Sequence, residues 1–112
     1  MEHVWNTKSV SNNTAALNNS LWGPSVWMQI HQYALTAPQD TDAIVRFYTV
    51  TIPSQIQCFA CLEKYTKMLR VYPIPNESSK LFEWTVQIHN IVNLMLHKPI
   101  MDLDEAKKRW SA

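Results

Sequence analysis

The chain has 112 residues, of which 46% are hydrophobic and 11% aromatic, so it is long enough to bury one sizeable core. This composition excludes a disordered or disulfide-scaffolded protein, and a single glycine leaves little material for a glycine-rich phosphate loop. The formal net charge of +1 gives no long-range field that would gather nucleic acid. Because this charge is so small, we expect no nucleic-acid partner. No apolar run reaches roughly 18 residues, so we also expect no membrane span.

The start of the chain differs in composition from the rest. Residues 1–20 are rich in Asn, Ser and Thr and show no sustained apolar period. We therefore predict a mobile or loosely docked arm over residues 1–20 and one folded domain over residues 21–112. The arm has neither the apolar core of a signal peptide nor an arginine-rich transit pattern, which favours a cytoplasmic protein.

The first half of the folded part predicts two helices. One begins at Gly23 and Pro24, a proline suited to a first helical turn, and carries apolar residues at spacings of three and four as far as Ala37. The next begins at the capping cluster of residues 40–42 and ends before Pro53. Its β-branched residues would also suit a strand, but we favour a helix because no alternating partner strand is found elsewhere.

The second half predicts three more helices. One begins at the cysteine pair and runs to about Arg70, and the next, over about residues 79–97, has the clearest apolar face and should be the central packing element. A short fifth helix follows Pro99, with Asp102 as its cap and Glu105 as its capping-box partner. The predicted fold class is all-α, a four-helix bundle with a short fifth C-terminal helix.

Cys58 and Cys61 are the only cysteines, and they are predicted to stand at a helix start. A C-x-x-C there favours redox chemistry, because the helix dipole stabilises a thiolate and one turn brings two sulfurs within disulfide reach. A zinc site is less favoured because the histidines lack the compact spacing of a structural pair, and we predict no metal. Two buried core thiols are the plain alternative.

Polar side chains flank two of the apolar faces. His89, Asn90 and Asn93 lie beside the face of the fourth helix, and His31 follows Trp27 by one turn on the first helix. The plain alternatives are a solvated flank for the first group and a satisfied core histidine for the second. If the two flanks face each other, they would line a slot for a flat heteroaromatic ligand with polar edges.

Taken together, these features resemble the Erv/ALR family of FAD-dependent sulfhydryl oxidases over residues 22–110. "WGPSVWMQIHQYA" is similar to the family's W-x-x-x-H first helix, "CFAC" to its flavin-proximal C-x-x-C, and "HNIVNLMLHKP" fits the pattern H-N-x-V-N-x-x-L-x-K-P. A WGP-type chain without a second cysteine pair looks like the short branch encoded by large cytoplasmic DNA viruses. That likeness implies the host cytoplasm or the virion as its location.

The resemblance implies FAD as cofactor and a thiol oxidase reaction. A substrate dithiolate would attack Cys58, the more exposed cysteine, and Cys61, against the isoalloxazine, would pass two electrons to FAD and then to O2, giving hydrogen peroxide. The substrate would be a dithiol protein or a thioredoxin-like relay protein. The residues implied to contact FAD are Trp22, Gly23, Trp27, His31, His89, Asn90, Val92, Asn93, Lys98 and Trp110.

The family also implies a homodimer that pairs through its first two helices. A different function stays open as the alternative: a helical, dimeric adaptor or thiol-binding scaffold that has kept the bundle and lost the chemistry. The intact C-x-x-C and the uninterrupted "HNIVN" favour the enzyme.

Overall fold

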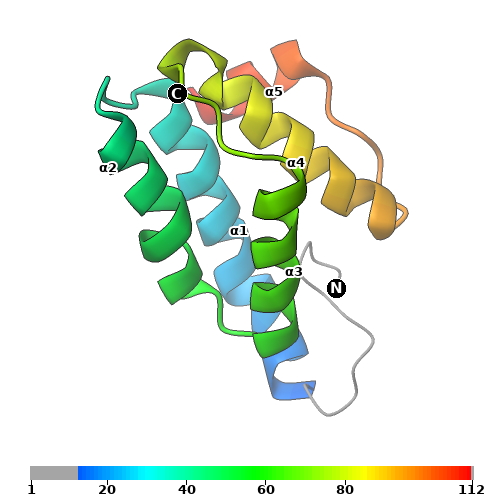
Figure 1. The fold of residues 1–112 in the computed structure, drawn as a ribbon. Helices are drawn as coiled ribbons and strands as arrows, with labels where there is room; N and C mark the ends of the chain where they lie inside the picture. The colour runs from blue at the N-terminus through cyan, green and yellow to red at the C-terminus, as the bar shows by residue number, and fades with distance from the viewer. Residues whose placement is uncertain (1–12, 112) are drawn as a thin grey trace.

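The computed structural model describes residues 13–111, with side chains from Trp22 onward; residues 1–12 of the predicted arm lie outside this part. Within it the chain forms five α-helices and no strand, which confirms the predicted all-α class (Figure 1). None of these helices is long and apolar enough to cross a membrane. Their bounds are α1 Asn13–Leu35, α2 Thr41–Arg46, α3 Phe59–Val71, α4 Leu81–Met95 and α5 Leu103–Trp110.

The first helix begins earlier than its sequence predicts. α1 starts at Asn13, so the prediction of a start at Gly23 and Pro24 is wrong, and helix extends into the segment predicted as an arm over residues 1–20. Pro24 lies inside α1 with its side chain exposed. A proline in a first turn and an exposed proline within a helix have the same φ, and the sequence alone does not separate them.

α4 is the central packing element, as predicted. Its main partner is α1, and α5 packs against both of them (Figure 1). His89 and Asn93 are only 7% and 6% exposed, which excludes the alternative of a solvated flank. Most of α4 is buried, and only Glu83, Gln87, Leu94 and Met95 are exposed. The buried residues are Leu81, Phe82, Trp84, Thr85, Val86, Ile88, His89, Val92 and Asn93.

The segment after Asp40 is a helix rather than a strand, as predicted, but the type of helix changes along its length. α2 continues into a π-helical segment, η2 (Phe47–Thr51), and then into a 3-10 turn, η3 (Pro53–Gln55). In η2 the Ile52 amide bonds to the carbonyl of Phe47 at 2.9 Å. Pro53 has no amide hydrogen, so the carbonyl of Tyr48 receives no hydrogen bond from either of the amides that would normally reach it.

Two buried tyrosines supply hydrogen bonds around this π-helical segment. The Tyr65 hydroxyl on α3 donates to the carbonyl of Tyr48 at 2.6 Å, and the Tyr48 hydroxyl donates to the carbonyl of Ile30 on α1 at 2.8 Å. Burial raises the pKa of both phenols, so both remain protonated donors. These bonds tie α1, η2 and α3 together one turn beyond Cys61.

The end of α4 is set by a Schellman turn. The His97 amide bonds to the carbonyl of Leu94 at 3.2 Å, and the Lys98 amide bonds to the carbonyl of Asn93 at 2.8 Å. His97 takes the left-handed position of this turn, with φ of 58°. Pro99 follows and prevents the helix from continuing. The turn fixes the place where Lys98 leaves the helix.

We predict that His97→Gly stabilises the protein. The left-handed conformation costs a residue with a Cβ about 1–2 kcal/mol, of which the extra freedom of glycine in the unfolded chain cancels part, so the unfolding free energy should rise by ~0.5–1 kcal/mol. Urea denaturation measures the change. His97→Val, whose β-branch disfavours this conformation, is the control and should destabilise; equal shifts in the two variants would contradict the assignment.

Candidate functional site

The cysteine pair stands where the sequence places it, at the start of α3. Cys58 is the N-cap in an extended conformation, and its Sγ accepts the backbone amide of Cys61 at 3.3 Å. The segment that leads to Cys58 is fixed to α1 by Gln55, whose side-chain amide exchanges hydrogen bonds of 2.7 and 2.9 Å with that of Gln29. A sulfur in this position receives the partial positive charge of a helix N-terminus.

Both cysteines lie in the core. Cys58 is 2% exposed and Cys61 is 0% exposed, so the expectation that Cys58 is the more accessible is met only by a narrow margin. Phe59, between them in sequence, is 83% exposed. The exposed side chain nearest to the pair in sequence is therefore aromatic. A substrate can reach the buried Cys58 only if the side chains packed around it move.

A second cluster joins α1, α4 and α5 through stacked rings. Trp27 stacks on His89 with ring centroids 3.7 Å apart and planes inclined by 5°. His31 stacks on Trp110 with centroids 3.9 Å apart and planes inclined by 28°. The two flanks that the sequence analysis singled out therefore do face each other, and α5 adds the second tryptophan.

The two imidazoles are also hydrogen bonded. His31 Nε2 lies 2.8 Å from His89 Nδ1, and His31 Nδ1 lies 2.9 Å from the hydroxyl of Thr85. Burial, reinforced by the positive charge of Arg109, lowers the pKa of His31 to about 3. His31 is thus a neutral, bonded core histidine at neutral pH.

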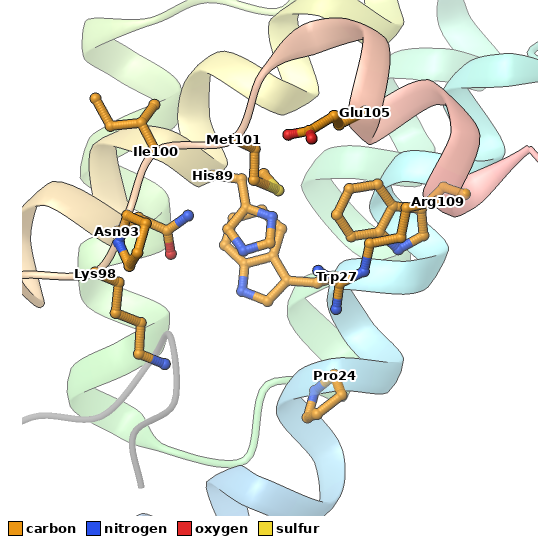
Figure 2. Close-up of a pocket in the computed structure, with 11 residues that line it drawn as sticks. Pro24, Trp27, His89, Asn93, Lys98, Ile100, Met101, Glu105 and Arg109 are labelled. Carbon is orange, nitrogen blue, oxygen red and sulfur yellow. The ribbon is translucent and has the colours of Figure 1, made fainter.

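A cavity of about 520 Å³ opens beside this cluster (Figure 2). Trp27, His89 and Trp110 supply its aromatic wall, and Lys98 and Arg109 supply cations. Burial lowers the pKa of Lys98, and the Arg109 guanidinium lies 4.8 Å from the centroid of the Trp110 ring. The cavity is lined by Pro24, Trp27, His89, Asn93, Lys98, Pro99, Ile100, Met101, Glu105, Arg109 and Trp110.

The cavity brings together half of the residues implied to contact a cofactor: Trp27, His89, Asn93, Lys98 and Trp110. His31 lies behind the wall, where it bonds to His89. Asn90 holds the loop instead, donating to the carbonyl of Met101 at 3.0 Å and accepting its amide at 2.8 Å. Val92 is in the core, and Trp22 and Gly23 are buried on α1 outside the lining. Neither cysteine lines the cavity.

Sequence reasoning missed the closing side of this cavity. Residues 99–101, Glu105 and Arg109 reach it only because the Schellman turn and Asn90 bring the loop and α5 back over α4. The Pro99 after the helix was a signal for the turn but not for its direction. Within the described residues, no group of three or more His, Cys, Asp or Glu side chains is placed to hold a metal ion.

Comparison with known proteins identifies the family of this chain. Residues 24–111 match the family model of the Erv1/Alr family, so the chain belongs to that family. A protein of Invertebrate iridescent virus 6, named as an FAD-linked sulfhydryl oxidase, is 34% identical over 102 residues, covering 80% of this chain and 92% of its own. The FAD-linked sulfhydryl oxidase ERV1 of Oryza sativa subsp. japonica is 30% identical over 103 residues, covering 86% of this chain and 52% of its own.

A further viral relative extends the comparison. The FAD-linked sulfhydryl oxidase of African swine fever virus is 30% identical over 93 residues, covering 77% of this chain and 76% of its own. A search of solved structures finds no significant match.

The buried imidazole predicts acid sensitivity. His31 has a pKa of about 3 in the folded protein against 6.5 for an unperturbed histidine, so below pH 6.5 the unfolded chain takes up a proton that the folded protein excludes. Stability is thus complete above pH 6.5 and falls on acidification towards pH 3. Between pH 7 and pH 5, His31 alone should lower the unfolding free energy by ~2 kcal/mol.

Urea denaturation at the two pH values measures this loss. His31→Asn, which keeps a polar side chain and removes the titration, is the control and isolates the histidine from the carboxylates. If the variant loses as much stability between pH 7 and pH 5 as the parent protein does, His31 is not the group responsible.

Proposed function

We propose that this chain is an FAD-linked thiol oxidase that forms disulfides in protein dithiol substrates and uses O2 as the electron acceptor. Its membership of the Erv1/Alr family and the names of its relatives support the class of enzyme. The observation that carries the chemistry is the contact of the Cys61 amide with Cys58 Sγ, because it holds Cys58 at the N-cap of α3 beside Cys61 in the first turn. No other cysteine occurs in the sequence.

The cavity fits FAD in its donor set. Trp27, His89 and Trp110 offer faces for a flat heteroaromatic ring, and Lys98 and Arg109 offer positive charge for a pyrophosphate. A volume of about 520 Å³ lies within the range of cofactor pockets.

The cysteines carry out the exchange with substrate. Starting from a Cys58–Cys61 disulfide, a substrate thiolate attacks Cys58 Sγ, forms a mixed disulfide and expels Cys61 as thiolate. The second substrate thiolate then attacks the substrate sulfur of that mixed disulfide, which completes the substrate disulfide and expels Cys58 as thiolate. The helix N-terminus and the Cys61 amide stabilise negative charge at Cys58.

Bound FAD would supply the two-electron chemistry that returns the cysteine pair to its disulfide and reduces O2 to hydrogen peroxide. The overall reaction is balanced: one dithiol and one O2 give one disulfide and one hydrogen peroxide. The chain's own residues bind and orient the cofactor through the cavity wall, and Tyr65 and Gln55 fix the helix that carries the cysteines.

Partners and location follow from the same proposal. The substrate is a protein dithiol or a thioredoxin-like relay protein, and the viral relatives support the host cytoplasm or the virion as the place of action. A homodimer would cover exposed apolar side chains on the first two helices: Met28 on α1, Val45 on α2 and Val50 on η2 are 43%, 40% and 56% exposed.

A visible absorption spectrum under air, with oxygen uptake recorded, tests the function. The purified protein should show flavin absorption that is lost on addition of a small dithiol and recovers as oxygen is consumed. Cys61→Ser should keep the flavin and lose turnover. Full activity in that variant would refute the electron path, and failure to take up added FAD would favour the dimeric adaptor.

Phe59 should contact the substrate protein, because it is the exposed side chain beside the buried cysteine pair. We predict that Phe59→Ser lowers kcat/KM for a protein dithiol by about tenfold more than for a small dithiol. The control is Val71→Ser at the other end of α3, which is 66% exposed and should change neither value. An equal loss with both substrates would show that Phe59 acts on the cysteines rather than on the partner.

A further inference from the structure

Thr85 occupies a position on α4 that no sequence motif marks. Its hydroxyl oxygen lies 2.6 Å from the carbonyl oxygen of Phe82 and 2.9 Å from Nδ1 of His31, and its side chain is fully buried. The contact with Phe82 is a return bond to the preceding turn, as helical threonines often make. The contact with His31 connects that bond to the wall of the cavity.

The two contacts fix where the hydrogens lie. A hydroxyl has one hydrogen, and a carbonyl can only accept, so the Thr85 hydroxyl donates to Phe82. The same oxygen must then accept from His31, which places a hydrogen on His31 Nδ1. The other nitrogen of a neutral His31 is an acceptor, so the 2.8 Å contact requires His89 Nδ1 to donate.

The opposite order of donors fails at the carbonyl. If His31 donated through Nε2 to His89, its Nδ1 would have to accept the Thr85 hydrogen. The Thr85 hydroxyl oxygen and the Phe82 carbonyl oxygen would then face each other at 2.6 Å with no hydrogen between them, although Thr85 is fully buried and Phe82 is only 6% exposed. Charging His31 to escape this conflict is opposed by its burial and by Arg109.

We propose that Thr85 is a positioning residue that fixes His31 and His89 as Nδ1–H tautomers, so that Nε2 of His89 is the acceptor nitrogen of the cavity wall. Lys98 and Arg109 line the same cavity and disfavour a further positive charge on His89, with Glu105 the acid among the lining residues. The ring stacked on Trp27 is then uncharged, with a fixed orientation.

This tautomer determines which edge of a bound ring can form a hydrogen bond with His89. An acceptor nitrogen at His89 favours a heteroaromatic ring that presents an N–H donor, such as an exocyclic amine or an imide, and disfavours an edge made of acceptors alone. Both ring systems of FAD carry such donors. The tautomer assignment stands on the protein's own contacts, whereas the ligand preference rests on the proposed function.

Nitrogen-15 NMR of the histidine rings in the purified protein at neutral pH tests the assignment. The parent protein and Thr85→Ser, which keeps the hydroxyl, should show protonated Nδ1 and unprotonated Nε2 on both His31 and His89. Thr85→Val, which has a similar shape and no hydroxyl, should move the hydrogen of His31 to Nε2 and that of His89 with it. Protonated Nε2 on either ring of the parent protein, or unchanged rings in the valine variant, would overturn the proposal.

A titration with FAD gives the second readout. Thr85→Val should weaken FAD binding by about tenfold, and Thr85→Ser should restore it to within about twofold of the parent protein. Equal weakening in both variants would assign Thr85 a packing role only. If no variant binds FAD, the proposed function fails, and the NMR result still decides the tautomers; if the valine variant does not fold, the spectra of the parent protein and the serine variant decide them.

Discussion

The contact between α1 and α4 determines most of this structure, because it combines an apolar interface with polar groups that only their partners across the interface can satisfy. The ring of His31 is enclosed on α1, and its two nitrogens find Thr85 and His89 on α4. A buried imidazole without those partners would be costly, so the rotation and the separation of the two helices are tightly set. The stacking of Trp27 and Trp110 on the same rings then places α5.

That arrangement also explains why the cavity lies where it does. The rings of Trp27 on α1, His89 on α4 and Trp110 on α5 form the aromatic wall, and residues 98–101 after α4 complete the lining (Figure 2). Lys98 and Arg109 line the cavity on either side of the Trp27 and His89 rings (Figure 2). α5 therefore supplies both a ring of the aromatic wall, Trp110, and a cation, Arg109, and the amide of Asn90 holds the loop that leads to α5.

Much of the helical framework could be predicted from local chemistry. The cap at Asp102, the start of α3 at the cysteines and the buried face of α4 each depend on neighbouring residues, and the structure confirms all three. The start of α1 could not be predicted because an exposed proline within a helix and a proline in its first turn have the same backbone geometry. Thr85 gave no signal because its partner is 54 residues away in sequence.

The π-helical segment has a consequence for insertions and deletions in this chain. Ile44, Tyr48 and Ile52 are buried at intervals of four residues, which slightly exceeds one α-turn and falls short of one wider π-turn. The angular drift over the first interval is therefore offset over the second, and the three side chains stay in line. Deleting one residue from η2 could leave a regular α-helix with every backbone amide bonded, yet it would rotate either Tyr48 or Ile52 out of the core. The alignment of the side chains therefore requires the extra residue, which backbone bonding alone does not, so a change of length in this helix disturbs the core more than a change in a loop.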